Sequence, residues 1–219
     1  MAAACVRSGR APDAAALVAI SKTVSVERLR LAQAAGYDTL GENRVQEAAD
    51  KVPVLEPAAW HLVGHLQKNK AAKAVELFDL IESVDSSALA DRLDRLVGER
   101  GSRSGETLPV MLQVNVDGDD AKGGFEPAVV ERELESLLAL PHLEIRGLMT
   151  VGFQTGGGDA ARPTFVRLRE LSERLRAADP RLGPGLSMGM TDDFEEAIEE
   201  GSTLVRVGRA LFGERPHAA

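Results

Sequence analysis

The fold is restricted above all by eight short apolar runs that alternate along the chain with segments of helical character. Runs of this kind are typical of strands that are buried on both faces. Parallel strands need crossover connections, and the helical segments between the runs supply them. The runs span residues 16–21, 38–42, 60–65, 80–85, 109–116, 144–151, 185–190 and 204–208.

Four of the intervening segments carry signals of helix faces and ends. One places Leu29 and Ala32 near a single face and ends on Gly36, a residue suited to the position after a helix. The others offer leucines three or four residues apart, an early proline or an acidic capping box. We predict helices over residues 26–36, 86–101, 163–180 and 192–201.

Eight strand-then-helix units predict a single-domain α/β protein, a (β/α)₈ TIM barrel. A doubly wound open sheet remains the alternative, because a count of short strands can be wrong by one or two. We expect one domain over residues 1–219, since this length is ordinary for a barrel.

Three stretches are expected to lie outside the regular fold. Residues 1–12 read as a shortened or frayed N-terminal segment, and the glycine-rich stretches 98–109 and 154–163 read as surface loops. Cys5 is the only cysteine, which excludes disulfides and thiolate metal sites by count and fits a reducing cytoplasm.

The charge of the chain argues against two classes of partner. A net charge of −8 disfavours electrostatic binding to nucleic acid or to an anionic membrane. No run approaches the 18 apolar residues of a membrane span, and the N-terminus is not a convincing signal peptide. We therefore expect a cytoplasmic protein.

Functional residues of a parallel barrel gather at the carboxyl ends of its strands. The first run ends on Lys22, whose ammonium needs solvent or a partner there. It reads either as a surface lysine in a loop or as a reactive amine at the mouth of a pocket. The other run ends bring Glu42, Asn43, Gly64, His65, Gln67, Asn115, Lys122, Met149, Thr150, Ser187, Met188, Gly189, Met190 and Arg206 to the same mouth.

The last two runs predict a phosphate site, because barrels commonly bind phosphate with the loops after strands seven and eight. Four carboxylates within residues 192–196 would repel a dianion, so we place the phosphate between Ser187 and the backbone of Gly208 and Arg209. Pyridoxal 5′-phosphate (PLP) fits a site with a phosphate nest and an amine on the opposite wall. Phosphorylated sugars and nucleotides remain alternatives.

Other polar residues permit more than one interpretation. His61 and His65 lie four apart on a predicted strand, too far apart to chelate easily, so we predict no metal site. Asn43 is either a neighbour of the cofactor or the cap of the helix that follows. Lys122 is read as a solvated loop lysine rather than a cofactor acceptor. The methionines at 149, 188 and 190 fill the barrel or pack on a ring.

Six motifs in order resemble the pyridoxal-phosphate homeostasis protein family of the YggS/PROSC type, which is similar to the barrel domain of alanine racemase standing alone. They are "AISKT", "LGENRVQEAADK", "WHLVGHLQKNK", "IRGLMTVG", "LSMGMTDDFEEAI" and "LVRVGRALFG", and the resemblance covers residues 9–213. The sequence departs from the family pattern at Val24, Thr191 and Arg209; at the last, a backbone contact to phosphate would survive but a hydroxyl contact would be lost.

The resemblance implies a monomeric PLP-binding barrel in which Lys22 forms the Schiff base and Arg206 lies beside the pyridine nitrogen. Partial burial and the nearby Arg206 are expected to lower the pKa of Lys22. The cofactor-binding residues expected on this basis are Lys22, Asn43, Met149, Ser187, Met190, Arg206, Gly208 and Arg209.

The implied function is buffering or delivery of PLP, with an influence on amino-acid and keto-acid balance and no established turnover, so we do not expect an enzyme. PLP-dependent apo-enzymes are the implied recipients. A PLP-dependent racemase or lyase is the alternative, and a barrel enzyme acting on a phosphorylated metabolite without PLP is a more remote one. Arg206 would leave the ring a poor electron sink, and Tyr37, the only tyrosine, falls at the end of the first helix rather than at the mouth.

Overall fold

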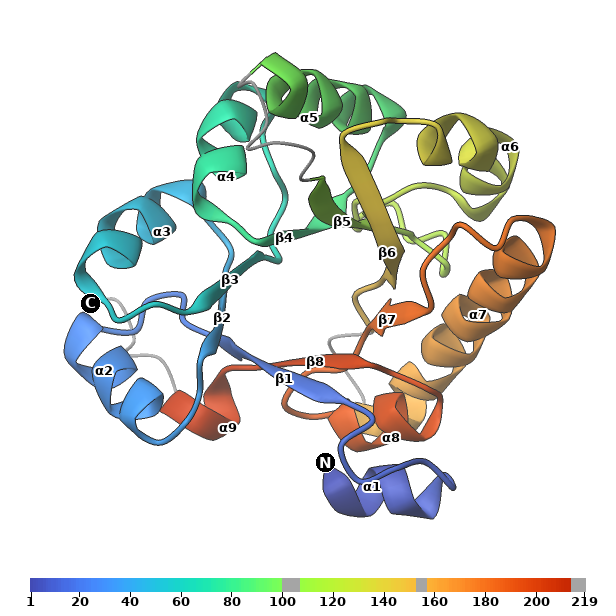
Figure 1. Ribbon diagram of the computed structural model, residues 1–219. Helices are drawn as coiled ribbons and strands as arrows, with labels where there is room; N and C mark the ends of the chain where they lie inside the picture. Colours follow the sequence, from blue (N-terminus) through green and yellow to red (C-terminus); the bar gives the residue numbers. More distant parts are fainter. Residues whose placement is uncertain (100–106, 153–156, 214–219) are drawn as a thin grey trace.

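The computed structural model describes residues 1–99, 107–152 and 157–213, and within these ranges eight parallel strands close into a barrel. Each strand pairs with the next, and the last pairs with the first, so the open sheet is excluded (Figure 1). The strands are β1 (Ala16–Ile20), β2 (Thr39–Glu42), β3 (Ala59–Leu62), β4 (Leu80–Val84), β5 (Leu108–Gln113), β6 (Leu143–Met149), β7 (Gly185–Ser187) and β8 (Leu204–Val207).

Helices surround the barrel, and each predicted helix is present within a few residues of its expected bounds except at one end (Figure 1). No helix of the described ranges is long and apolar enough to cross a bilayer. The helices are α1 (Ala2–Arg7), α2 (Val26–Ala34), α3 (Val45–Lys51), η1 (Val52–Val54), η2 (Lys68–Lys70), α4 (Ala71–Leu77), α5 (Ser87–Glu99), α6 (Pro127–Leu138), α7 (Gly157–Ala178), α8 (Phe194–Glu199) and α9 (Arg209–Phe212).

The exception is the start of α7, which begins six residues before the expected proline. The prediction of a surface loop over 154–163 is therefore wrong from residue 157 onward. Packing on α8 explains the difference: Ala161 is buried, and Arg162 pairs with Glu199 at 2.7 Å. Gly158 comes so close to α8 that an added Cβ would lie 2.0 Å from the carboxyl carbon of Glu196.

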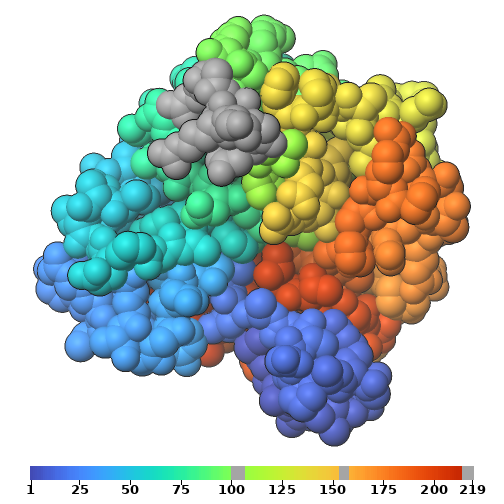
Figure 2. All heavy atoms as spheres, viewed as in Figure 1, coloured from blue at the N-terminus to red at the C-terminus, as the bar shows by residue number. Residues whose placement is uncertain are grey.

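The other two irregular stretches also differ from expectation. In 98–109, α5 continues to Glu99 and β5 begins at Leu108, while residues 100–106 lie outside the described ranges. The N-terminal segment is not frayed over residues 2–7, because α1 buries Ala4 and Cys5. In the space-filling view α1, in dark blue, lies beside the orange and red C-terminal third of the chain (Figure 2).

Ion pairs and capping fix α1 and the residues after it to α8. Arg7 contacts Glu195 at 2.6 Å and Glu199 at 2.9 Å. Arg10 donates to the carbonyl oxygens of Ile198 at 2.9 Å and Ser202 at 2.8 Å, which satisfies acceptors at the C-terminal end of α8.

Side chains alternate between the two faces of each strand, and the two faces differ in chemistry. The outward face packs on the helices through residues such as Ala19, Leu40 and Leu148. The inward face combines a small apolar cluster, which contains Met149, with a layer of buried polar side chains. That polar layer forms part of the candidate site.

Candidate functional site

Lys22 lies just beyond the carboxyl end of β1, whose last residue, Ile20, shares a face with Gly41 of β2. Ile20 is paired with Gly41 of β2, and an added Cβ on Gly41 would lie 2.6 Å from Ile20 Cδ1. Lys22 follows Ile20 by two residues, beyond the end of the strand and at the carboxyl end of the barrel. Its side chain is partly buried, as expected at the rim of a pocket rather than on an open surface.

A tight turn carries Lys22. The amide of Val24 donates to the carbonyl oxygen of Ser21 at 3.0 Å, which leaves Lys22 and Thr23 in the middle of the turn. Thr23 has φ of 63°, a left-handed conformation that β-branched residues rarely adopt. Strained residues of this kind are concentrated at functional sites.

Four strands contribute to the polar layer inside the barrel. Glu82 of β4 accepts a hydrogen bond from Nδ1 of His61 on β3 at 2.7 Å and another from the hydroxyl of Ser187 on β7. Arg206 of β8 donates to Ser187 Oγ at 2.5 Å and to the carbonyl oxygen of Thr150 at 2.7 Å. The layer therefore joins a carboxylate and a guanidinium through one serine.

The charges of this layer support each other. Burial raises the pKa of Glu82, but the hydrogen bond from His61 and the charges of His61 and Arg206 outweigh it, so the pKa lies below its usual value. Burial lowers the pKa of Arg206, and the charges of Glu82 and Asp193 oppose that shift. An arginine keeps its proton in proteins, so Glu82 and Arg206 are opposite buried charges that Ser187 bridges, while the direct ionic contact of Glu82 is with His61.

A second buried carboxylate, Glu42, has the opposite behaviour. Its pKa is raised, because burial outweighs the hydrogen bonds from Lys51 and Ser21 and the charge of Lys51. Glu42 was expected at the mouth, but it follows the inward-facing Gly41 and lies on the outer face of β2, where it contacts Lys51 of α3 at 2.6 Å.

These opposite shifts predict opposite pH dependences for two glutamine variants. A lowered pKa contributes stability above the unfolded value of about 4.3, and this is lost as the pH falls through the folded pKa. A raised pKa contributes stability below that unfolded value, and this is lost as the pH rises through the folded pKa. From pH 4 to pH 7, Glu82→Gln should lose unfolding free energy relative to wild type, whereas Glu42→Gln should gain. Urea unfolding across that range measures both, and parallel curves would contradict the assignment.

The predicted phosphate end of the site has only part of the expected geometry. Ser187 is fully buried, and its single hydroxyl proton is directed to Glu82, so it offers a phosphate no donor. Gly208 is the residue that precedes α9, where helix N–H groups lack partners within the helix. The Arg209 side chain turns to Asp192 with an ion pair.

The acidic turn before α8 is less repulsive to an anion than its sequence indicates. Besides the Asp192 pair with Arg209, Asp193 is buried and accepts the amide hydrogen of Met190 at 2.5 Å. Burial is the main cause that raises the pKa of Asp193. Glu195 pairs with Arg7.

The structure separates the alternatives for several other residues. Asn43 is not a helix cap, because Arg44 precedes α3 and no side chain caps it. Met149 is buried against Leu80 and Met111 inside the barrel, and Met188 packs in the outer core. The partly buried Met190 lies in the loop after β7.

The two histidines face different partners. His61 contacts Glu82, whereas the largely exposed His65 contacts Asp85 at 2.8 Å. Within the described ranges, no group of three histidine, cysteine, aspartate or glutamate side chains could hold a metal ion.

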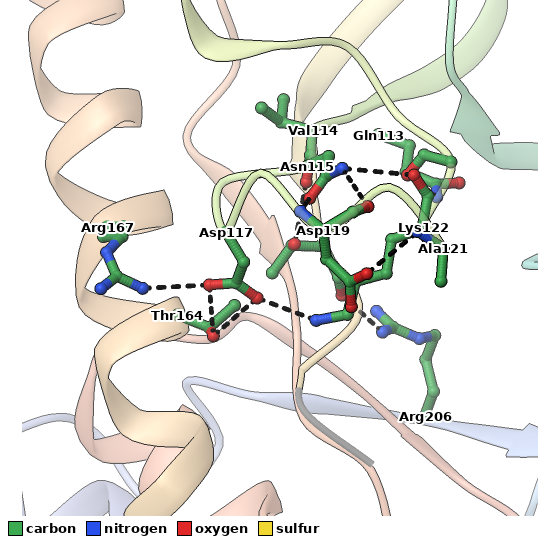
Figure 3. A network of polar contacts seen from close by, with 12 residues as sticks. Gln113, Val114, Asn115, Asp117, Asp119, Ala121, Lys122, Thr164, Arg167 and Arg206 are labelled. Atoms are coloured by element: carbon green, nitrogen blue, oxygen red, sulfur yellow. Dashed lines mark hydrogen bonds and ion pairs between the residues drawn. The ribbon is translucent and has the colours of Figure 1, made fainter.

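Lys122 is not the solvated loop lysine expected from the sequence. Its side chain is 16% exposed, and its amine donates to Asp117 at 2.8 Å (Figure 3). Asp117 also accepts hydrogen bonds from Thr164 at 2.8 Å and Arg167 at 3.0 Å, both on α7. The loop after β5 is thereby fixed to α7 beside the mouth.

Sequence reasoning missed Glu82, Asp117 and Lys51 as parts of this arrangement. Glu82 had a signal, since a carboxylate inside an apolar run must find a partner. Lys51 had none, because a lysine in the last turn of a helix is usually exposed.

Known proteins share the sequence pattern and the fold of this chain. The family model described as alanine racemase, N-terminal domain, matches residues 6–216. The pyridoxal phosphate homeostasis protein of Aquifex aeolicus is 40% identical over 216 residues, which cover 98% of this chain and 93% of that protein.

Solved structures give the same result. PipY of Synechococcus elongatus is 42% identical in its structure without PLP, with a TM-score of 0.86 and coverage of 97% of this chain and 98% of PipY. Its structure with PLP bound is 41% identical, with a TM-score of 0.85 and the same coverage. An alanine racemase of Clostridium difficile, 16% identical, shares the fold over 93% of this chain and 52% of its own, with a TM-score of 0.73. The motif resemblance is confirmed, and the chain belongs to the pyridoxal phosphate homeostasis protein family, within the wider alanine racemase N-terminal domain family.

Proposed function

We propose that this protein binds PLP at the carboxyl end of its barrel and acts in PLP homeostasis, with Lys22 as the residue that forms the Schiff base. The observation that carries the proposal is the position of Lys22, which follows β1 at the barrel mouth, next to the strand that carries the buried Arg206. The chain is also 41% identical to a protein whose structure holds PLP. The aldehyde supplies an electrophile, and an amine is the group that condenses with it.

The side chains present fit such a ligand. A guanidinium has five N–H donors, and Arg206 directs one nitrogen to Ser187 and another to Thr150, so donors remain that can face a ring nitrogen. Because Ser187 is committed to Glu82, its role is to fix Arg206, and the phosphate falls to the backbone N–H groups of Gly208 and Arg209.

The remaining predicted residues take supporting places. Asn43 and Met190 line the rim as neighbours of the ring, and Met149 closes the interior beneath it. We further propose that the protein is a monomer, that it is cytoplasmic, and that it delivers PLP to apo-enzymes. The molar mass measured by light scattering tests whether the protein is a monomer.

Binding without turnover follows from the site's acid–base groups. Arg206 cannot accept a proton, so beside a bound PLP it would keep the ring nitrogen unprotonated, and the cofactor would then be a weak electron sink. Racemisation also needs a proton carrier on the second face. Tyr37, the only tyrosine, precedes β2 and therefore lies at the amino end of the barrel, opposite the mouth.

The expected result for catalysis is the absence of sustained exchange of the α-proton of amino acids. We expect the PLP-loaded protein to exchange deuterium at rates far below about 1 per second, the low end of ordinary enzymes. Proton NMR of a panel of L-amino acids in D₂O measures this. Turnover at enzyme rates would replace the homeostasis assignment with a racemase or lyase.

Delivery is tested separately. The PLP-loaded protein is mixed with a PLP-requiring apo-enzyme, with and without a scavenger of free PLP. Recovery of enzyme activity despite the scavenger supports direct transfer, and recovery only without it leaves simple release.

A further inference from the structure

Two side chains of α3 hold the backbone on both sides of Lys22. The carbonyl oxygen of Ser21 accepts a hydrogen bond from Lys51 Nζ at 2.8 Å, and the amide of Thr23 donates to Glu47 Oε2 at 3.0 Å. The residue before Lys22 and the residue after it are therefore both tied to α3.

Ser21, Glu42 and Lys51 form a closed, buried set of contacts, which we call the contact ring. Ser21 Oγ donates to Glu42 Oε1 at 2.7 Å, and Lys51 donates to the same oxygen at 2.6 Å while also binding the Ser21 carbonyl. Lys51 completes its set of three acceptors with Glu47 at 3.5 Å. Lys51 therefore has three oxygen partners, two of which accept hydrogen bonds from it.

The contact ring lies outside the barrel and cannot touch a ligand in the mouth. Glu42 is on the opposite face of β2 from Gly41, and Lys51 approaches from α3. Any effect of these residues on a ligand must act through the turn that carries Lys22.

Two observations indicate that the contact ring constrains geometry. Thr23 keeps a strained left-handed conformation, which persists only where the surroundings impose it. A buried ion pair is in general a weak source of stability compared with apolar side chains of similar volume. Glu42 and Lys51 are 0% and 8% exposed, so their charges carry that cost.

The geometry points to Glu42 and Lys51 as positioning residues that hold the strained Lys22 turn and so keep the amine at the barrel mouth. The inference rests on the proposed function, because it concerns how Lys22 is presented to an aldehyde. It assigns a role to residues that contact no part of the ligand.

The test separates capture of the aldehyde from binding of the rest of the molecule. Lys51→Met removes the ammonium and keeps most of the stem. We expect the second-order rate constant for PLP capture, followed by absorbance and by borohydride trapping on Lys22, to fall by about tenfold or more, since small misplacements of reacting groups are costly. The dissociation constant of pyridoxine 5′-phosphate, which has no aldehyde, should stay within about twofold of wild type, because its contacts do not include the imine.

Two variants keep the test interpretable. Glu42→Leu with Lys51→Met removes both charges, so neither is left buried alone, and it should show the same selective loss of capture. Asp94→Asn is the matched control, because Asp94 also accepts a backbone amide, that of His142 at 2.8 Å, at the amino end of the barrel. It should leave both measurements unchanged.

Each outcome decides a different question. If the wild-type protein captures no PLP, the proposed function fails and the inference falls with it. If wild type captures PLP and Lys51→Met captures it equally fast, only the inference is overturned. Equal losses of capture and of pyridoxine 5′-phosphate binding in both variants would also overturn it, because they would indicate general damage to the site.

Discussion

Replacing Lys22 with alanine should abolish covalent retention of PLP while the barrel stays folded. The variant should lack the absorbance near the visible edge that the loaded wild type shows, and borohydride should attach no cofactor at position 22. The reason is chemical: the amine is the nucleophile, and no methyl group can replace it. Absorbance and peptide mass spectrometry after reduction measure the loss.

Two further variants make this result specific. Lys22→Arg keeps the positive charge but carries a guanidinium that stays protonated, so it should be as deficient as alanine. Lys68→Ala removes an exposed lysine from η2, which follows β3 at the same end of the barrel, and should behave as wild type. Persistence of the band in Lys22→Ala would show that another lysine carries the cofactor.

The largest expected loss of stability comes from Glu82→Ala. This substitution removes the carboxylate that His61 contacts directly and that Arg206 reaches through Ser187, and an uncompensated buried charge typically costs about 3–5 kcal/mol. For a domain of this size such a loss corresponds to roughly 6–20 °C in melting temperature. Urea unfolding at pH 7 measures it directly.

The double variant Glu82→Leu with Arg206→Met is the control for this argument. It removes both charges, so most of the lost stability should return if the unpaired guanidinium is the cause. A single variant that loses less than about 1 kcal/mol would mean that Asp193 or water compensates Arg206 and that Glu82 is not the main restraint on the layer.

The sequence predicted the barrel well because its strands end where the chemistry changes. The run at 16–21 stops at Ser21 and Lys22, and the observed strand ends at Ile20, one residue earlier. Local information is less exact elsewhere, since β3, β5 and β7 each end three residues before the ends of the predicted runs at 60–65, 109–116 and 185–190. The closed order of the strands needs the structure, since pairing of β1 with β8 joins opposite ends of the chain.

The errors have tertiary causes. α7 starts early because α8 packs on Gly158 and Ala161, which the local propensity of three glycines does not reveal. Lys122 appeared solvated because its partner Asp117 is itself held by residues of α7. The outward position of Glu42 follows from strand alternation, because Glu42 is adjacent to the inward-facing Gly41.

Lys22 follows β1 and Arg206 lies on β8. These two strands are neighbours in the barrel, although they are the first and the last strand of the chain. Val18 of β1 stands beside Arg206 of β8 in the register that seals the barrel. A growing chain therefore lacks the complete site until its final strand has emerged and docked. Truncation anywhere before β8 removes Arg206, so we expect such a fragment to retain no PLP at the proposed site.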